Sequence, residues 1–199
     1  MRLKTCNFCM FSIFCFCCVS VFAETKIPVV VNIGHAGQLG YKWPVVSVSA
    51  GLESYHENHW SHVTGKFSPT DKISYGDVTR YGVTGEIFWK SRRGLFIGGG
   101  GTLRNIRFHD LGPGQSYWTY GPTVAGGWLK DGTRIILRGH VYEHDVRYDF
   151  YGLSWTITHD IKARIRLGAE QGFYKVGPKG SGQRLGNAFV SSVVVGFVF

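Results

Sequence analysis

The last thirteen residues of the chain, Asn187 to Phe199, alternate between two kinds of side chain with a period of two. Bulky apolar residues occupy every second position near the end, and smaller residues lie between them. The bulky set is Phe199, Phe197, Val195 and Val193, and the set between them is Val198, Gly196, Val194 and Ser192. Successive side chains of a β-strand point to opposite faces, so this period predicts a strand. One face of that strand is bulky and apolar.

The same alternation recurs upstream in seven further segments. They run over residues 45–55, 81–90, 95–106, 117–129, 134–144, 148–158 and 161–173. In segment 161–173, apolar residues such as Ile165 and Leu167 alternate with charged ones such as Arg166. Abundant glycine and aromatic residues also favour β-structure. We therefore expect an all-β fold, an eight-stranded antiparallel up-and-down β-barrel.

The alternation alone permits two barrels that are inside out relative to each other. In a soluble barrel of the lipocalin or avidin kind the apolar face points inward, whereas in a membrane barrel it contacts lipid. The expected strands have about 10 to 13 residues, which matches a tilted bilayer crossing. Aromatic residues also gather near strand ends, as they do at membrane interfaces. These features favour a transmembrane β-barrel.

The closing residues Gly196-Phe197-Val198-Phe199 resemble the C-terminal strand by which bacterial outer-membrane β-barrels are recognised for assembly. The predicted architecture also resembles the small barrels typified by OmpX and the membrane domain of OmpA. This resemblance implies that Phe197 and Phe199 form an assembly signal for the barrel-assembly machinery. It also implies a place in the bacterial cell outer membrane, among membrane lipid and lipopolysaccharide.

Residues 1–23 have the features of a cleaved signal peptide. Arg2 and Lys4 precede an apolar run over residues 8–22, and Ala23 provides a small residue for signal peptidase. The run is shorter than the roughly 18 to 20 residues of a spanning helix. All five cysteines of the chain lie within residues 1–23, so the expected mature chain has no disulfide, thiolate metal site or cysteine nucleophile.

The links between the expected strands are of unequal length. Longer links, over 56–80, 107–116 and 174–186, fall only at odd positions, and a tight link carries the hairpin dipeptide Asp131-Gly132. Tight periplasmic turns and longer outer loops are typical of outer-membrane barrels. A strand at 29–33 would be a ninth and would break the even count. We therefore expect residues 24–44 to be a periplasmic lead-in and 45–199 to be the barrel domain.

Charged residues on the polar faces of these strands predict a network inside the barrel. The predicted members are Glu53, Glu86, Arg138, His140, Lys162, Arg164, Arg166 and Glu170. Side chains just fill the lumen of an eight-stranded barrel, so we expect a plug of ion pairs. Because the basic members outnumber the acidic ones, a narrow anion-favouring channel is an alternative.

Two polar stretches are predicted to be surface loops. The first, 56–80, holds three histidines spaced by three, and imidazole binds zinc and copper. A long loop does not fix metal geometry, so we expect no metal and no cofactor. Its triplet His59-Trp60-Ser61 looks like the His-x-Ser of outer-membrane lipid hydrolases, but it lies in an expected loop and no Asn follows the serine. The last loop offers a surface contact for polyanions at Lys175, Lys179 and Arg184.

The net charge narrows the class of partner. The whole chain carries 22 basic and 13 acidic residues, and removing Arg2 and Lys4 leaves 20 basic ones. An exported basic chain without a nucleic-acid-reading motif is predicted to contact anionic lipid or lipopolysaccharide, and no nucleic acid. We expect a structural, envelope-integrity or surface-interaction role, with a host or surface ligand left open and no catalytic residue assigned. The alternatives are the small channel and an outer-membrane enzyme that modifies lipid A or phospholipid.

Overall fold

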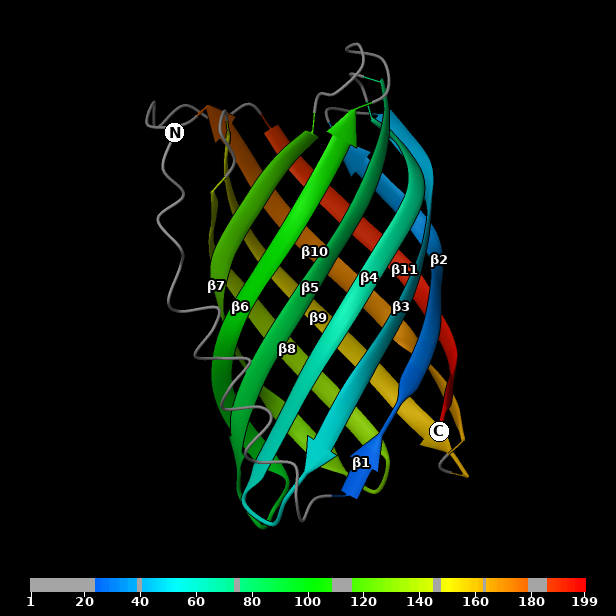
Figure 1. The fold of residues 1–199 in the computed structure, drawn as a ribbon, viewed down its shortest axis with the longest axis vertical. Helices are drawn as coiled ribbons and strands as arrows, with labels where there is room; N and C mark the ends of the chain where they lie inside the picture. Colours follow the sequence, from blue (N-terminus) through cyan, green and yellow to red (C-terminus); the bar gives the residue numbers. More distant parts are fainter. Residues whose placement is uncertain are drawn as a thin grey trace.

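The protein is a closed antiparallel β-barrel (Figure 1), seen in a computed structural model that describes residues 24–38, 41–73, 76–108, 116–144, 148–162, 164–178 and 186–199. The strands are β1 (Glu24–Lys26), β2 (Pro28–Gln38), β3 (Tyr41–Tyr55), β4 (His59–Ile73), β5 (Gly76–Lys90), β6 (Leu95–Phe108), β7 (Ser116–Lys130), β8 (Thr133–His144), β9 (Tyr148–Ile161), β10 (Ile165–Pro178) and β11 (Gly186–Val198). The all-β antiparallel prediction is confirmed. Within the described ranges, no helix has the length and apolar character needed to cross a membrane. The expected signal peptide lies outside these ranges.

The barrel has ten strands, and the prediction of eight is wrong. Strands β2 to β11 follow one another around the wall, and β2 pairs with β11 to close it. The first additional strand, β2, occupies most of the expected lead-in at 24–44. The second, β4, lies within the expected loop at 56–80. Two missed strands keep the count even, which removes the objection to a strand at 29–33.

Strand β4 escaped prediction because its outward face is only partly apolar. Trp60 is only 1% exposed and belongs to the buried interior, whereas the flanking His59 and Ser61 lie on the other face of the strand. Beyond Ser61 the same outward face carries Val63 and the 46% exposed Phe67, so this strand has only a short apolar stripe and begins with polar residues. In sequence it therefore resembles a polar loop.

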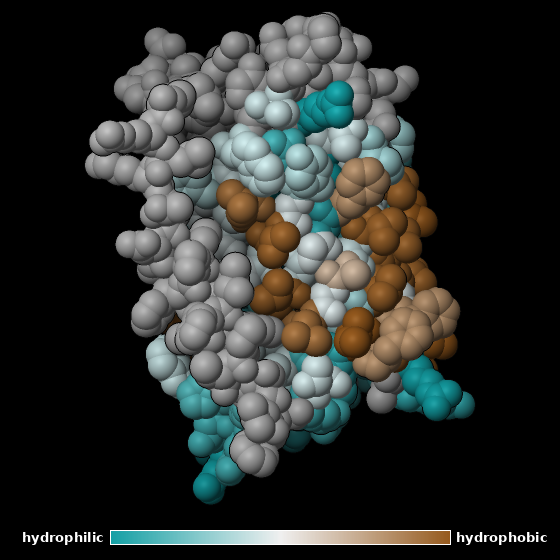
Figure 2. Space-filling model, viewed as in Figure 1, coloured by the Kyte–Doolittle hydropathy of each residue, from teal (hydrophilic) through white to brown (hydrophobic). Residues whose placement is uncertain are grey.

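The outer wall is apolar and the inner wall is mostly polar or small. Exposed apolar residues occur at alternate positions of the strands, among them Val83, Ile97, Val124, Leu137, Leu153 and Val193. The view in Figure 2 shows hydrophobic side chains across the middle of one side and hydrophilic ones at the lower end. This distribution is inside out relative to a soluble barrel, and the fold is that of a small outer-membrane β-barrel.

The connections at one end of the barrel are short, and we call this end the turn end. They span residues 56–58, 91–94, 131–132 and 162–164, and β1 and Phe199 lie at the same end (Figure 1). Asp131 and Gly132 both have positive φ, 52° and 77°, as a two-residue type I′ hairpin requires. The hairpin predicted from this dipeptide is confirmed. The opposite, or loop, end carries the connections 39–40, 74–75, 109–115, 145–147 and 179–185, which lie outside the described residues.

The glycine run of β6 allows neighbouring strands to approach closely. A Cβ atom on Gly98 would strike the carbonyl oxygen of Ile87, and one on Gly100 would strike that of Gly85. Both carbonyls belong to β5. A Cβ on Gly101, in contrast, would lie 3.5 Å from its nearest neighbour, the carbonyl oxygen of Gly121. The run therefore serves the packing of the wall, as glycines inside strands often do.

Candidate functional site: the lumen at the turn end

Three aromatic rings from adjacent strands fill part of the lumen near the turn end. Trp60 of β4, Phe88 of β5 and Phe96 of β6 are each at most 5% exposed. The ring centroids of Trp60 and Phe88 lie 4.6 Å apart, and those of Phe96 lie 5.1 and 5.0 Å from Trp60 and Phe88. Such stacked and edge-on pairs add packing energy beyond area burial. Ala125 of β7 completes this aromatic cluster.

Four charged residues fill the other side of the same level, and we call them the ion quartet. They are Glu53 of β3, Arg134 of β8, Asp160 of β9 and Arg166 of β10, all at most 7% exposed. Arg166 donates to both oxygens of Glu53 at 2.7 and 2.9 Å, and its Nε donates to Asp160 Oδ1 at 2.8 Å. Arg134 donates to Glu53 at 3.2 Å and also to Asp160 Oδ2. Two cations and two anions make the quartet neutral.

Tyr55 joins the ion quartet to the aromatic cluster. Its hydroxyl donates to Glu53 Oε2 at 2.7 Å, and its ring lies 6.2 Å from that of Trp60 at an interplanar angle of 10°. The guanidinium of Arg134 lies 6.0 Å from the centroid of the same ring. The aromatic cluster and the ion quartet therefore form one continuous layer, which we call the turn-end plug.

A second charged group lies one inward position farther from the turn end. Arg138 donates to both oxygens of Glu86 at 2.7 Å, and Thr123 donates to Glu86 Oε1 at 2.7 Å. The Nε2 atom of His62 lies 3.2 Å from Glu86 Oε2. Glu86 lies two positions before Phe88 on β5, and His62 lies two positions after Trp60 on β4. Both steps lead toward the loop end, so this group covers the aromatic cluster from the loop side.

The third charged group is in contact with water. Glu170 of β10 accepts a hydrogen bond from Asn32 of β2 at 3.1 Å, and the ammonium of Lys66 of β4 lies 3.5 Å from the same oxygen. The side chain of Lys66 is 44% exposed and that of Glu170 is 22% exposed, whereas that of Glu86 is fully buried. The described lumen is therefore dry at the turn end and wetter toward the loop end.

The structure brings five of the predicted network residues into these groups: Glu53, Glu86, Arg138, Arg166 and Glu170. It excludes two others. Lys162 and Arg164 are exposed and lie in the turn between β9 and β10, where Lys162 has a φ of 49°. The prediction that they lie in the lumen is wrong. It arose because apolar and charged residues continue to alternate through this short turn, as they do in the strand that follows. The side chain of His140 lies outside the described part of the chain.

Four ionisable members of the three groups were not predicted: Arg134, Asp160, His62 and Lys66. Asp160 fell in a segment expected to be a link, and both β4 residues fell in the expected first loop. Arg134 could have been predicted from the sequence. It lies four positions before Arg138 and therefore shares its face of β8. Of the expected polyanion contacts, Lys175 is exposed on β10, and Lys179 and Arg184 lie outside the described residues.

The histidines of the first expected loop do not converge. His59 and His62 lie on β4 three positions apart and so point to opposite faces, while His56 lies in the preceding turn. Among the residues that the structure describes, no group of three His, Cys, Asp or Glu side chains is placed to hold a metal ion. The pleat puts His59 and Ser61 together on the outer face of β4, so the expectation that they lie in a loop is wrong.

Similarity to known proteins is found among solved structures. No family model matches the chain, and no curated protein matches it. Among solved structures, Neisserial surface protein A and Ail of Yersinia pestis each have 10% identity and a TM-score of 0.41, over 89% of this chain and 99% of theirs. The β domain of the Bordetella autotransporter BrkA has 12% identity and a TM-score of 0.46, over 89% of this chain and 98% of its own. These likenesses concern the fold alone.

Proposed function

We propose that the protein is an integral outer-membrane β-barrel, exported by a cleaved signal peptide, whose lumen is closed at the periplasmic end. Its role is then structural, in envelope integrity or in contacts at the cell surface, and not conduction. The observation that carries this proposal is the turn-end plug. Its aromatic cluster covers the side of β4 to β7, and its ion quartet covers the side of β3 and β8 to β10.

The outer wall supports the placement in a membrane. On β7, the exposed Trp118 and Tyr120 lie toward the loop end, and the half-buried Trp128 lies toward the turn end. The eight residue steps from Tyr120 to Trp128 cover about 26 Å along the strand, or about 20 Å after a tilt of roughly 40°. An apolar band of about 25 Å between aromatic girdles is typical of outer-membrane barrels. The two longest connections, 109–115 and 179–185, are at the opposite end, which supports a periplasmic position for the turn end.

The plug is suited to block ions because it is both dry and neutral. A ten-stranded barrel is wider than an eight-stranded one, so small inward side chains alone would leave a path for water. Here three rings and four paired charges fill the section where such a path would leave the barrel. Each cation of the ion quartet contacts both anions, which leaves no excess charge to attract a passing ion.

Planar-bilayer recording tests the proposal. The wild-type barrel is expected to show no steady conductance, whereas Trp60→Ala/Phe88→Ala removes two rings of the plug and is expected to give reproducible currents. Trp128→Ala, which changes a tryptophan outside the aromatic cluster, is the matched control and is expected to stay closed. Steady wild-type currents would contradict the proposal, as would a silent double variant that is folded and inserted.

A small anion-favouring channel is the second candidate, and the exposure of Lys66 favours it. Water reaches this lysine in the lumen, so the wetter part of the barrel carries an accessible positive charge. If the wild type conducts, Lys66→Glu is expected to lower its preference for chloride over potassium. Lys162→Glu, which changes an exposed lysine in a turn, provides the control.

A further inference from the structure

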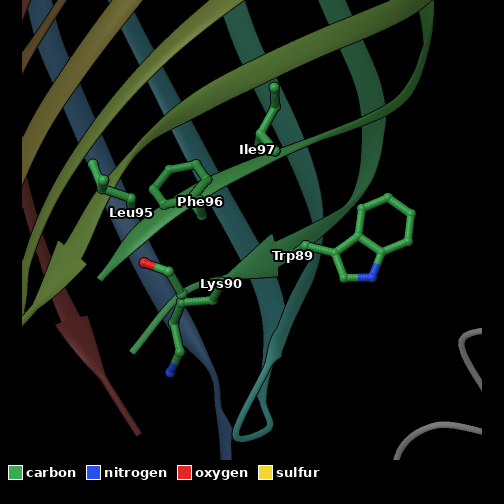
Figure 3. A pocket seen from close by; sticks show the side chains of 6 residues that line it. Trp89, Lys90, Leu95, Phe96 and Ile97 are labelled. Carbon is green, nitrogen blue, oxygen red and sulfur yellow. The ribbon is translucent and has the colours of Figure 1, made fainter. Parts of the chain in front are cut away.

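The outer surface carries a cavity at the turn end of the β5–β6 hairpin. It has a volume of about 460 Å³. The cavity is lined by Trp89, Lys90, Ser91, Leu95, Phe96 and Ile97, whose side chains are drawn in Figure 3. Trp89, Leu95 and Ile97 belong to the outward-facing set of their strands, whereas Phe96 is a member of the aromatic cluster, so the cavity lies on the outer side of the wall next to the plug.

The wall of this cavity is apolar and unusually open to its surroundings. Trp89 is 68% exposed, Leu95 is 59% exposed and Ile97 is 65% exposed. Trp89 and Ile97 are direct cross-strand partners, so the indole lies beside the isoleucine on the same face. Exposed apolar surface of this kind requires a non-aqueous partner. In a membrane barrel that partner is an acyl chain.

The edge of the cavity is basic. The turn that follows β5 reads Lys90-Ser91-Arg92-Arg93-Gly94, and Arg92 and Arg93 are exposed. In Figure 3 the side chain of Lys90 points toward the turn end, away from the apolar wall. An apolar surface and basic side chains thus meet at one place, as they do where a membrane changes from hydrocarbon to headgroups.

Backbone hydrogen bonds hold the basic turn in position. The N–H of Ser91 donates to the carbonyl of Leu95 at 2.7 Å, and the N–H of Leu129 on β7 donates to the carbonyl of Gly94 at 2.8 Å. Gly94 has a φ of +88°, a conformation that other residues adopt only with strain. Arg92 and Arg93 therefore project from a turn whose backbone is fixed by hydrogen bonds.

We propose that this cavity binds an anionic phospholipid of the inner leaflet, with an acyl chain on the Trp89–Ile97 wall and the phosphate at Arg92 and Arg93. The site rests on the proposed function, which places the turn end in the periplasm. Charge complementarity supports an anionic lipid, because the described residues at this end include seven Lys or Arg side chains and three acidic ones. The basic residues are Lys26, Lys90, Arg92, Arg93, Lys130, Lys162 and Arg164, and the acidic ones are Glu24, Glu57 and Asp131.

Native mass spectrometry of the folded barrel with an equimolar mixture of phosphatidylglycerol and phosphatidylcholine tests the site. The wild type is expected to retain phosphatidylglycerol preferentially. Arg92→Gln/Arg93→Gln is expected to lower the ratio of phosphatidylglycerol to phosphatidylcholine adducts about tenfold, because each basic group near a membrane surface favours anionic lipid. Trp89→Ala is expected to lower the retention of both lipids and to leave their ratio nearly unchanged.

Arg107→Gln is the matched control, since Arg107 is also exposed but lies near the loop end of β6. An unchanged ratio in the double arginine variant would overturn the site, and so would an equal fall with Arg107→Gln. Insertion of each variant into vesicles is measured separately. A wild type that does not insert contradicts the membrane proposal, whereas an inserted wild type without lipid preference contradicts the lipid site alone.

Discussion

Arg166 contacts both oxygens of Glu53, at 2.7 and 2.9 Å, although 113 positions separate the two residues in sequence. This fork joins β3 to β10 across the lumen, and these strands are not neighbours in the wall. A paired guanidinium and carboxylate bond in this geometry more strongly than neutral groups do. The pair therefore ties together parts of the barrel that backbone hydrogen bonds do not join.

Removing Arg166 is expected to destabilise the barrel strongly. Arg166→Met leaves Arg134 to serve both Glu53 and Asp160, which puts an uncompensated negative charge in the buried plug. Breaking such a buried group costs about 3 to 5 kcal/mol. Urea unfolding in lipid vesicles measures the change, and Arg164→Met, in the exposed turn, is expected to stay within about 0.5 kcal/mol of the wild type.

Neutralising Glu53 in the Arg166→Met variant separates the cost of unbalanced charge in the plug from the cost of lost packing. The double variant Glu53→Gln/Arg166→Met leaves one cation and one anion, Arg134 and Asp160. Its cost is expected to be clearly smaller than the sum of the two single costs, because the plug is neutral again. Additive costs would show that the ion quartet does not act as a unit.

The alternating pattern in the sequence predicted the strands that have a clear apolar stripe on the outer face. It missed β2 and β4, in which the two faces differ less. In β2, Val29, Val30 and Val31 are consecutive, so apolar residues occupy both faces and the period of two is weak. In β4, Trp60 faces the lumen and the outward face begins with the polar residues His59 and Ser61. Period-two reasoning depends on contrast between the faces of a strand, and these two strands lack the expected contrast.

The charges of the plug were predictable in kind but not in partnership. Alternation placed Glu53 and Arg166 on inward faces, yet it gives no distance across a barrel and no strand count. Missing β2 and β4 changed which strands face each other, so the Glu53–Arg166 pair could not be derived. The ends of strands are also poorly defined by pattern, which put Lys162 in the lumen and Asp160 in a link.

The outward face of β7 provides a test of depth in the membrane. Val124 is 53% exposed and lies midway between Tyr120 and Trp128. Val124→Arg is expected to cost about 2 to 4 kcal/mol in vesicles, because arginine is least tolerated at the bilayer midplane. Ile161→Arg, at the turn end of β9, is expected to cost only about 0 to 1 kcal/mol. Equal costs at both positions would contradict the assigned depth.

The glycine run of β6 allows a comparison between adjacent residues. Gly100→Ala is expected to destabilise the barrel by about 1 to 3 kcal/mol, because the added methyl meets a backbone carbonyl that cannot rotate away. Gly101→Ala adds the same methyl where the nearest atom is 3.5 Å away, and we expect a change near zero. Vesicle unfolding of both variants measures the difference. Equal effects would indicate that loss of glycine flexibility, and not the contact, dominates.

Phe199 contributes to the barrel through its backbone and, we predict, to assembly through its side chain. Its N–H donates to the carbonyl of Ile27 at 3.1 Å and its carbonyl accepts from the N–H of Ile27 at 2.8 Å, while its side chain is 74% exposed. Phe199→Ala keeps both backbone bonds and removes only an outward ring. We expect it to lower the heat-modifiable, folded fraction in cells severalfold and to leave refolding in detergent nearly unchanged. Deletion of Phe199 removes the backbone bonds as well and is expected to slow refolding in detergent too. If Phe199→Ala impaired folding in cells and refolding in detergent equally, the ring would be a packing element of the barrel and not a signal to the assembly machinery.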